Sequence, residues 1–273
     1  YAGTANGEIY KYSDSNPIWT SSSVGLTVGY GILSIGIDRQ NPNIVYAGLN
    51  GAGVYKTIDG GLNCFLSGLA GLSIKSIEID PYNPAIIYAG TGSGIYRSAD
   101  SGVNWTEILP TVDVRKITLN PPDFNQNPLP AQTDIIYAAA IGGIYKSEHA
   151  GSNWKQLNTA GLPSQNFSAV IAAYDMTTVY AGTTDAGVSK SPDSGKTWAA
   201  SSDGLGNLNI KALTIHPQYS NTILAVTDTN GIYRTDQEGT SWYNWNGGNS
   251  APITNTTAFL LPQPSHILAG TSN

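Results

Sequence analysis

The chain has 273 residues, of which 40% are hydrophobic and 12% are charged, and its formal net charge at pH 7 is −6. The few basic residues are scattered, which argues against nucleic acid or an anionic membrane as a partner. No apolar run is long enough to span a membrane, and the single cysteine, Cys64, excludes an intrachain disulfide.

A tetrapeptide of the type Tyr-Ala-Gly-Thr recurs along the whole chain. Its copies begin at residues 1, 46, 88, 137, 180, 224 and 268, a spacing of about 45 residues. Each interval holds short segments rich in β-branched and aromatic residues, separated by turns that contain Gly. This pattern is typical of a four-stranded propeller blade. We therefore predict an all-β fold, a β-propeller of four-stranded antiparallel blades.

The third interval shows the elements of one repeat. Residues 86–91 and 95–98 predict two strands joined by a turn, and a second turn leads to a third strand that opens at Trp105. Residues 114–119 alternate polar and apolar side chains, as a half-buried strand does. A Pro-containing segment ends this strand, because Pro removes a ladder donor.

The repeats fall within one expected domain, residues 1–273. Their approximate limits are 1–45, 46–87, 88–136, 137–179, 180–223 and 224–267, followed by an extra strand at 268–273. The Tyr-Ala-Gly strand occurs seven times and the other strand types six times, so the repeat phase starts inside a blade. Residues 256–261 are expected to supply the strand missing from the first blade. Six blades are favoured on this count, and seven if the natural chain continues.

The turn after the second strand of each interval repeats in register. Its fullest copies are Ser-Ala-Asp-Ser-Gly-Val-Asn-Trp at 98–105 and Ser-Pro-Asp-Ser-Gly-Lys-Thr-Trp at 191–198. These copies resemble the Asp box, or bacterial neuraminidase repeat, with the pattern Ser-x-Asp-x-Gly-x-Thr-Trp. The residues that match this pattern across the six copies are Asp14, Trp19, Asp59, Gly61, Asp100, Gly102, Trp105, Gly151, Trp154, Asp193, Gly195, Trp198, Gly239 and Trp242.

A structural role follows for these residues from their chemistry. A short Asp side chain caps backbone N–H groups of a tight turn, Gly accepts a positive φ, and Trp buries a large apolar face. Cys64 replaces the Trp of its box, and His149 and Gln237 replace the Asp of theirs, which predicts weaker turns. In enzymes of this superfamily the boxes lie on the face away from the active site, so the resemblance also implies no catalytic role for them.

The superfamily that the boxes resemble includes sialidases, xyloglucanase-type glycoside hydrolases, sortilin-like receptors, propeller lectins and assembly factors of photosystem II. Fold therefore does not choose among functions. A sialidase binds its substrate with an arginine triad. This chain has four arginines, and Arg97 and Arg234 occupy a slot that is basic in every repeat. We therefore expect no sialidase activity.

Another kind of glycoside hydrolase would need two carboxylates across a cleft. The loops opposite the Asp boxes carry Glu8, Glu107, Asp113, Asp185, Asp203 and Asp228. Asp185 and Asp228 come from neighbouring repeats, so they are the leading pair if the chain is a hydrolase. Solvated loop acids are the simpler interpretation, and we predict no catalytic residue.

Metal and cofactor signals are weak. His149, His216 and His266 fall at turns of different repeats without zinc-ligand spacing, and Cys64 stands where a core Trp is expected. We therefore expect no metal and no cofactor.

Irregular loops offer better material for binding. The candidate ligand-binding residues are Tyr243, Trp245, Asn246, Tyr30, Phe167, Asp185 and Asp228. Exposed aromatic and amide groups of this kind stack on sugar rings or anchor protein contacts. Two alternatives stay open: Trp245 covers a gap between blades, and the long Pro- and Asn-rich segment 120–134 is either a docking loop or an ordinary loop.

The leading hypothesis is a non-catalytic propeller module, secreted to the extracellular space or periplasm, that binds a protein or a glycan and belongs to a larger chain or assembly. The surface, poor in charge and rich in Gly, Asn, Ser and Thr, supports that location. The alternatives are a polysaccharide-active hydrolase of the Asp-box type and a structural subunit of a surface layer or filament.

Overall fold

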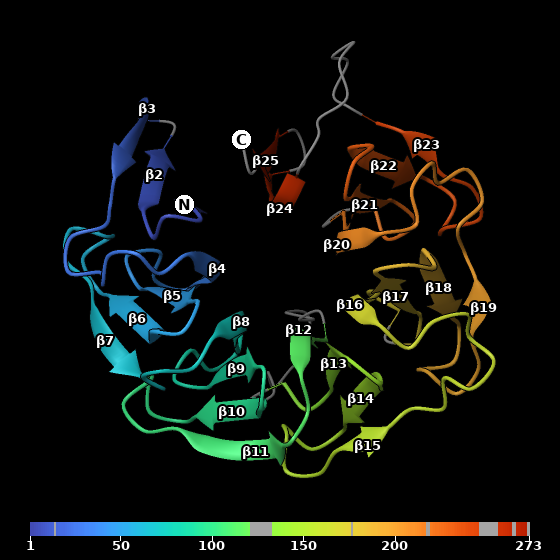
Figure 1. Ribbon diagram of the computed structural model, residues 1–273, viewed down its shortest axis with the longest axis horizontal. Helices are drawn as coiled ribbons and strands as arrows, with labels where there is room; N and C mark the ends of the chain where they lie inside the picture. The colour runs from blue at the N-terminus through green and yellow to red at the C-terminus, as the bar shows by residue number, and fades with distance from the viewer. Residues whose placement is uncertain are drawn as a thin grey trace. The chain divides into compact units, whose positions relative to one another are not determined.

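The computed structural model describes residues 1–13, 15–120, 133–175, 177–216, 219–245, 256–263 and 266–271. The chain is an all-β propeller of six blades with four-stranded antiparallel sheets, and these residues contain no helix. The predicted fold class and number of blades are thereby confirmed. Figure 1 shows the consecutive strands of each sheet lying side by side.

Five blades are complete, and each is a sheet of four strands in chain order. Their first strands are β4 (Ile32–Ile37), β8 (Ile74–Ile79), β12 (Val114–Leu119), β16 (Phe167–Ala172) and β20 (Ile210–Ile215). Their second strands are β5 (Val45–Leu49), β9 (Ile87–Thr91), β13 (Ile136–Ala140), β17 (Val179–Thr183) and β21 (Ile223–Thr227).

Each second strand is followed by a hairpin turn and a third strand, and the Asp-box turn then leads to the fourth. The third strands are β6 (Gly53–Thr57), β10 (Gly94–Ser98), β14 (Gly143–Ser147), β18 (Val188–Ser191) and β22 (Ile232–Thr235). The fourth strands are β7 (Phe65–Gly68), β11 (Thr106–Pro110), β15 (Lys155–Gln156), β19 (Ala199–Ala200) and β23 (Tyr243–Asn244).

The second strands form the core of each blade. Every residue of these five strands is buried, because each strand has a neighbour on both edges and packing on both faces. Tyr88 and Tyr137 are fully buried and belong to the Tyr-Ala-Gly motif. The recurring tetrapeptide is therefore the buried centre of the blade, as β-branched and aromatic residues favour.

The first strands share an irregularity near their start. In β4, β8, β16 and β20 the pairing with the second strand skips the second residue, which is Leu33, Lys75, Ser168 or Lys211. A β-bulge of this kind redirects the side chain of the unpaired residue. The bulge lies at the end of the sheet opposite the Asp-box turn, beside the hairpin between the second and third strands.

The first blade contains three strands, β1 (Ala2–Gly3), β2 (Ile9–Ser13) and β3 (Asn16–Ser21). The prediction that residues 256–261 complete this blade is wrong. They belong to β24 (Thr256–Gln263), which pairs with β25 (His266–Thr271) in a two-stranded sheet. The expected extra strand is thus the pairing partner of β24, since two strands separated by two residues of chain pair at little loop-closure entropy.

The chain divides into two compact units. One comprises residues 1–136 and 147–154, and the other comprises residues 137–146 and 155–273. The division passes through the sheet of β12 to β15, and each unit is described by itself below. In the first unit Ile74, Ile77 and Ile87 form part of the core, and in the second Tyr180 and Ile210 do so.

Candidate functional site

The Asp-box turn between β10 and β11 is closed around Asp100. Its Oδ1 accepts hydrogen bonds from the Ser98 hydroxyl and the Asn104 backbone N–H, both at 2.8 Å, and its Oδ2 accepts one from Asn104 Nδ2 at 2.7 Å. The Gly102 N–H donates to Ser98 Oγ at 2.9 Å. Ser101 and Gly102 both have positive φ, 60° and 86°, which lets the turn reverse the chain within four residues.

The same arrangement recurs in two other boxes. Asp59 accepts from Asn63 and Thr57, and Asp193 accepts from Thr197 and Ser191, with distances between 2.7 and 2.9 Å. These donors lower the pKa of each carboxyl to about 2, with residues 63, 104 and 197 contributing most. Both oxygens of all three carboxylates therefore accept hydrogen bonds within their own turns.

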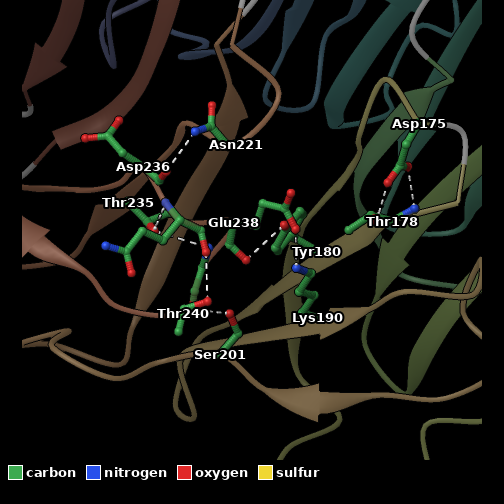
Figure 2. A network of polar contacts seen from close by, with 12 residues as sticks. Asp175, Thr178, Tyr180, Lys190, Ser201, Asn221, Thr235, Asp236, Glu238 and Thr240 are labelled. Carbon is green, nitrogen blue, oxygen red and sulfur yellow. Dashed lines mark hydrogen bonds and ion pairs between the residues drawn. The ribbon is translucent and has the colours of Figure 1, made fainter.

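Boxes also join neighbouring blades, and Figure 2 shows one such joint in the second unit. The Tyr180 hydroxyl donates to the Glu238 carbonyl at 3.0 Å, and Lys190 Nζ lies 2.9 Å from Glu238 Oε2. The Ser201 hydroxyl donates to the Gly239 carbonyl at 2.7 Å. A box of one blade is therefore bound by the second, third and fourth strands of the blade before it.

The first unit repeats this joint. Tyr46 and Lys56 both donate to the Ser101 carbonyl at 2.9 Å, and Ser67 donates to the Gly102 carbonyl at 2.9 Å. A Cβ added at Gly102 would lie 2.4 Å from Ser67 Oγ, so the box Gly also provides the space that the joint needs. The boxes thus build turns and connect blades.

The basic slot of the repeat belongs to the same joint. Each cation lies between 5.2 and 5.9 Å from the centre of the Tyr ring on the neighbouring strand, within cation–π range. The pairs are Lys11 with Tyr1, Lys56 with Tyr46, Arg97 with Tyr88, Lys146 with Tyr137 and Lys190 with Tyr180. This geometry supports the interpretation of the slot as a structural feature of the blade.

The box that carries Cys64 in place of Trp keeps part of the joint. In the box of the next blade, the Trp105 Nε1–H donates to the Ser67 carbonyl of the blade before it at 3.0 Å. Cys64 Sγ takes the same place and lies 3.8 Å from the Ser22 carbonyl, the counterpart of the Ser67 carbonyl. Cys64 is one of the residues that line a cavity of about 10 Å³ at this joint. Burial raises the pKa of the Cys64 thiol, which disfavours the reactive thiolate.

The two boxes without Asp close their turns through the backbone. Ser152 N–H donates to the His149 carbonyl at 2.9 Å, and Thr240 N–H donates to the Gln237 carbonyl at 3.0 Å. Asp14, of the first box, lies outside the described residues. Trp19 of that box is 42% exposed and contacts the Tyr12 ring at a centroid distance of 5.5 Å.

Tyr243, a predicted ligand-binding residue, belongs to a polar cluster beside the last box. Its hydroxyl donates to Asp236 Oδ2 at 2.6 Å, while Arg234 and the Thr222 hydroxyl bind Asp236 Oδ1 at 2.8 Å. Asp236 directly precedes Gln237, the residue that stands where the box has Asp. Figure 2 shows Asn221 Nδ2 donating to the Asp236 carbonyl. Tyr243 is 46% exposed, but its hydroxyl is engaged in the turn.

Trp245 stands at a blade-joining position. The backbone N–H of Trp245 donates to the Ile232 carbonyl at 2.7 Å. In the blade before it, the backbone N–H of Ser201 donates to the Val188 carbonyl in the same way. Ser201 is the residue that contacts the following box. The Arg234 guanidinium lies 5.7 Å from the Trp245 ring, which favours the packing interpretation of this residue. Asn246 lies outside the described residues, as do most residues of the segment 120–134.

Phe167 is not available to a ligand, so its assignment as a ligand-binding residue is wrong. It opens β16 and is fully buried, like Ile74, Val114 and Ile210 at the same position of their blades. Comparison of the repeats at this position would have revealed it as a core residue. Tyr30, by contrast, is 40% exposed, and a Cβ added at Gly51 would lie 3.6 Å from its ring.

Two of the candidate acids are held in ion pairs. Asp113 pairs with Lys75 in the first unit, and Asp228 Oδ1 lies 2.9 Å from Lys211 Nζ in the second. Both lysines are bulge residues of first strands. Sequence reasoning missed them because the bulge, which redirects their side chains, is visible only once the strand pairing is known.

The second unit places an Asn beside an Asp twice, at the same end of two neighbouring sheets. Asn166 Nδ2 lies 3.5 Å from Asp185 Oδ2, and Asn209 Nδ2 lies 3.5 Å from Asp228 Oδ2. Each Asn directly precedes a first strand, and each Asp lies in the following hairpin turn. Ser168 Oγ donates to the Ile210 carbonyl at 2.6 Å and joins the two sheets beside these pairs.

Among the described residues, no three His, Cys, Asp or Glu side chains gather as a metal site would require. Within the same residues, no helix has the length and apolar character needed to cross a membrane.

Comparisons with known proteins show what this chain is similar to. It resembles the GH74 xyloglucanase from Xanthomonas campestris at 18% identity and a TM-score of 0.75, over 99% of this chain and 48% of the enzyme. It resembles a structure described as YCF48 bound to D1 peptide at 15% identity and a TM-score of 0.72, over 97% of this chain and 84% of that one. A GH74 enzyme from Niastella koreensis matches at 18% identity and a TM-score of 0.67, over 88% of this chain and 42% of the enzyme.

The chain thus spans less than half the length of these two GH74 enzymes. No family model matches the sequence, and no curated protein matches it. At these identities the likeness concerns the propeller fold alone.

Proposed function

We propose that this chain is a non-catalytic binding module of the extracellular space or periplasm, which recognises a protein or a glycan through the loop end of its second unit. The observation that carries the proposal is the repeated pair Asn166–Asp185 and Asn209–Asp228 on neighbouring sheets. An amide beside a carboxylate offers both donors and acceptors, which suits the hydroxyl groups of a sugar or the peptide groups of an extended chain.

The geometry of the pairs supports binding from solvent. Both Asn–Asp distances are 3.5 Å, at the long limit of a hydrogen bond, so a ligand group can replace the contact at little cost. Asn166 and Asp185 are exposed, and Asn209 and Asp228 are half-buried. Lys211 adds a cation beside Asp228.

The ion pairs also favour binding over hydrolysis. A glycoside hydrolase uses one carboxyl as a proton donor and another as a base or nucleophile. Asp228 and Asp113, two acids of the predicted set, each lie against a lysine, and this contact holds the side chain in a position that suits orienting a ligand. One protein of similar fold is a xyloglucanase and another is YCF48 bound to D1 peptide, so both ligand classes are compatible with the fold.

The test is binding of the labelled chain to a glycan array and to a peptide array. We expect a defined set of ligands, bound about tenfold more weakly by the double variant Asp185→Ala, Asp228→Ala. The matched control is Asp203→Ala, which removes an exposed loop acid outside both pairs and should leave binding unchanged. Equal loss in the control, or retained binding in the double variant, would contradict the proposed site.

The same preparations distinguish a hydrolase. Reducing-sugar release should be absent on a panel of plant and microbial glucans. Release by the wild-type chain that Asp228→Ala abolishes would overturn the non-catalytic assignment.

A further inference from the structure

A groove lies between the first two blades, within the first unit. One wall comes from β2 and β3 of the first blade, and the other comes from the Asp-box turn that leads from β6 to β7. Its volume of about 320 Å³ is in the range of small-molecule sites. A lysine, an aspartate, several hydroxyl residues and two aliphatic residues line it. This mixture of polar and apolar groups suits a small polar ligand.

The cation of the groove is Lys11. Its Nζ donates to the Gly60 carbonyl at 3.1 Å, and the residue is half-buried. An ammonium group has three N–H donors, and this bond uses one of them. A Cβ added at Gly60 would lie 2.8 Å from Lys11 Nζ. The ammonium therefore lies where a side chain at position 60 would begin.

The equivalent joint of the second unit shows which group such a lysine binds. There the box residue at this position is Glu238, and Lys190 Nζ lies 2.9 Å from Glu238 Oε2. In chain order the six boxes have Ser15, Gly60, Ser101, Ala150, Ser194 and Glu238 at this position, so Gly60 is the one residue without a side chain. The groove thus offers Lys11 to a carboxylate that the box itself does not supply.

The other groups of the groove suit a sugar ring. Thr20 and Ser21 of β3 are exposed hydroxyl residues, which donate to and accept from sugar hydroxyl groups. Ile18 of β3 is 67% exposed and Leu62 of the box is 71% exposed, so apolar surface is available to the C–H groups of a ring. Asp59 repels a second carboxylate but accepts from hydroxyl groups, which orients an acidic sugar with its carboxylate towards Lys11.

We propose that this groove binds an acidic sugar, a uronic acid unit whose carboxylate pairs with Lys11 and whose hydroxyl groups face Asp59 and β3. The site lies in the first unit and uses none of the loop residues of the function proposed above. The double variant Asp185→Ala, Asp228→Ala should therefore bind the acidic sugar as the wild-type chain does, and either proposal can fail alone.

Titration of the chain with three probes, followed by amide chemical shifts, tests the proposal. Methyl β-D-glucuronide should give saturable shifts at residues 20–22 and 59–62. Methyl β-D-glucoside lacks the carboxylate and acetate lacks the ring, so each should bind at least about tenfold more weakly. Equal affinity of the glucoside would remove the role of Lys11, and equal affinity of acetate would remove the sugar. Either result, or no saturable binding, would overturn the proposal.

Two pairs of variants locate the site. Lys11→Met should weaken binding of the glucuronide about tenfold, whereas Lys56→Met, which removes the equivalent lysine of the next joint, should leave it unchanged. Gly60→Glu should abolish binding, because it supplies the carboxylate that Glu238 supplies to Lys190. Gly60→Ser introduces the residue of the next box without a charge and should retain binding.

The Gly60 variants decide the outcome if Lys11→Met does not fold. Unchanged affinity in Gly60→Glu, or equal loss in Gly60→Glu and Gly60→Ser, would overturn the pairing of the ligand carboxylate with Lys11. Calorimetry of each variant shows whether its native fold is kept.

Discussion

The third position of the box decides how each turn is closed. Where it is Asp, as at Asp100, one carboxylate accepts from a hydroxyl, a backbone N–H and an amide at once. Where it is His149 or Gln237, the backbone carbonyl of that residue accepts the N–H three residues later at 2.9 and 3.0 Å, a contact that measures 3.4 Å at Asp100 and Asp193. The side chain at the position before Trp is still a donor in both boxes, Asn153 and Ser241. An Asp introduced at position 149 or 237 would therefore have hydrogen-bond donors within its own turn.

This leads to a prediction at the scale of single residues. Gln237→Asp and His149→Asp should each raise the melting temperature, by about 2 °C, because each adds charge-assisted hydrogen bonds to an existing turn. Differential scanning calorimetry measures the change. Gln237→Asn is the control, since it has the length of Asp without the charge, and it should gain less. A fall in melting temperature for both Asp variants would contradict this account of the box.

Single residues also show where reading the sequence succeeded and where it did not. The boxes were recognised because their chemistry is local, within eight residues of chain. Phe167 was misassigned because its burial depends on packing between strands, and Lys211 was missed because a bulge brings it to Asp228. The register of one strand against another is not contained in either segment alone.

At the scale of strands, the second strand of each blade carries the joint to the next. Tyr88 is fully buried and its hydroxyl donates to the Ala150 carbonyl at 3.1 Å. The Tyr46 hydroxyl donates to the Ser101 carbonyl, which also accepts a hydrogen bond from Lys56 Nζ. The Tyr88 hydrogen bond is buried, whereas the Tyr46 bond is only partly buried and its acceptor keeps Lys56 as a donor when the hydroxyl is removed.

We expect Tyr88→Phe to lower the free energy of unfolding by about 1 kcal/mol, because the hydrogen bond between its hydroxyl and the Ala150 carbonyl is buried. Tyr46→Phe should cost less, since Lys56 still binds the same carbonyl. Urea unfolding with an unchanged m value provides the measurement. Equal losses in the two variants would show that Lys56 does not compensate.

The strands themselves were predicted closely. The expected segments 86–91, 95–98 and 114–119 correspond to β9 (Ile87–Thr91), β10 (Gly94–Ser98) and β12 (Val114–Leu119). The fourth strands were less well defined, since β15, β19 and β23 have two residues each. Strands in the blade centre are specified by continuous apolar sequence, and edge strands are not.

At the scale of the whole molecule, the boxes link stability to pH. Asp59, Asp100 and Asp193 have pKa values of about 2 against an ordinary value of 3.8. Because these values are lowered by folding, the stability that the three carboxylates contribute is complete above pH 3.8 and is lost as the pH falls towards 2. The contribution is small for each exposed turn but repeats along the chain.

The expected result is a melting temperature that declines between about pH 4 and pH 2. In the triple variant Asp59→Asn, Asp100→Asn, Asp193→Asn, the melting temperature should be lower at pH 7 and the decline should be shallower. Calorimetry from pH 2 to pH 7 measures both. Parallel profiles for the two proteins would mean that other groups cause the acid sensitivity.

The sequence by itself determined the repeat, the all-β propeller with its number of blades, and the turn chemistry of the boxes. These features follow from local patterns that recur in phase, and recurrence makes each copy evidence for the others. Asp185 and Asp228, expected on loops opposite the boxes, lie beside Asn166 and Asn209 at one end of their sheets, and their role in ligand binding stays a prediction.

Only the tertiary structure decided which strands pair and which side chains those pairings bring together. Ala2-Gly3-Thr4 and Ala269-Gly270-Thr271 have the same sequence, so local pattern could not tell which of them would pair with residues 256–261. The structure pairs these residues, which belong to β24, with β25, and two residues of chain separate the two strands, so the pairing needs little closure entropy. That choice rests on chain connectivity rather than on the identity of the residues.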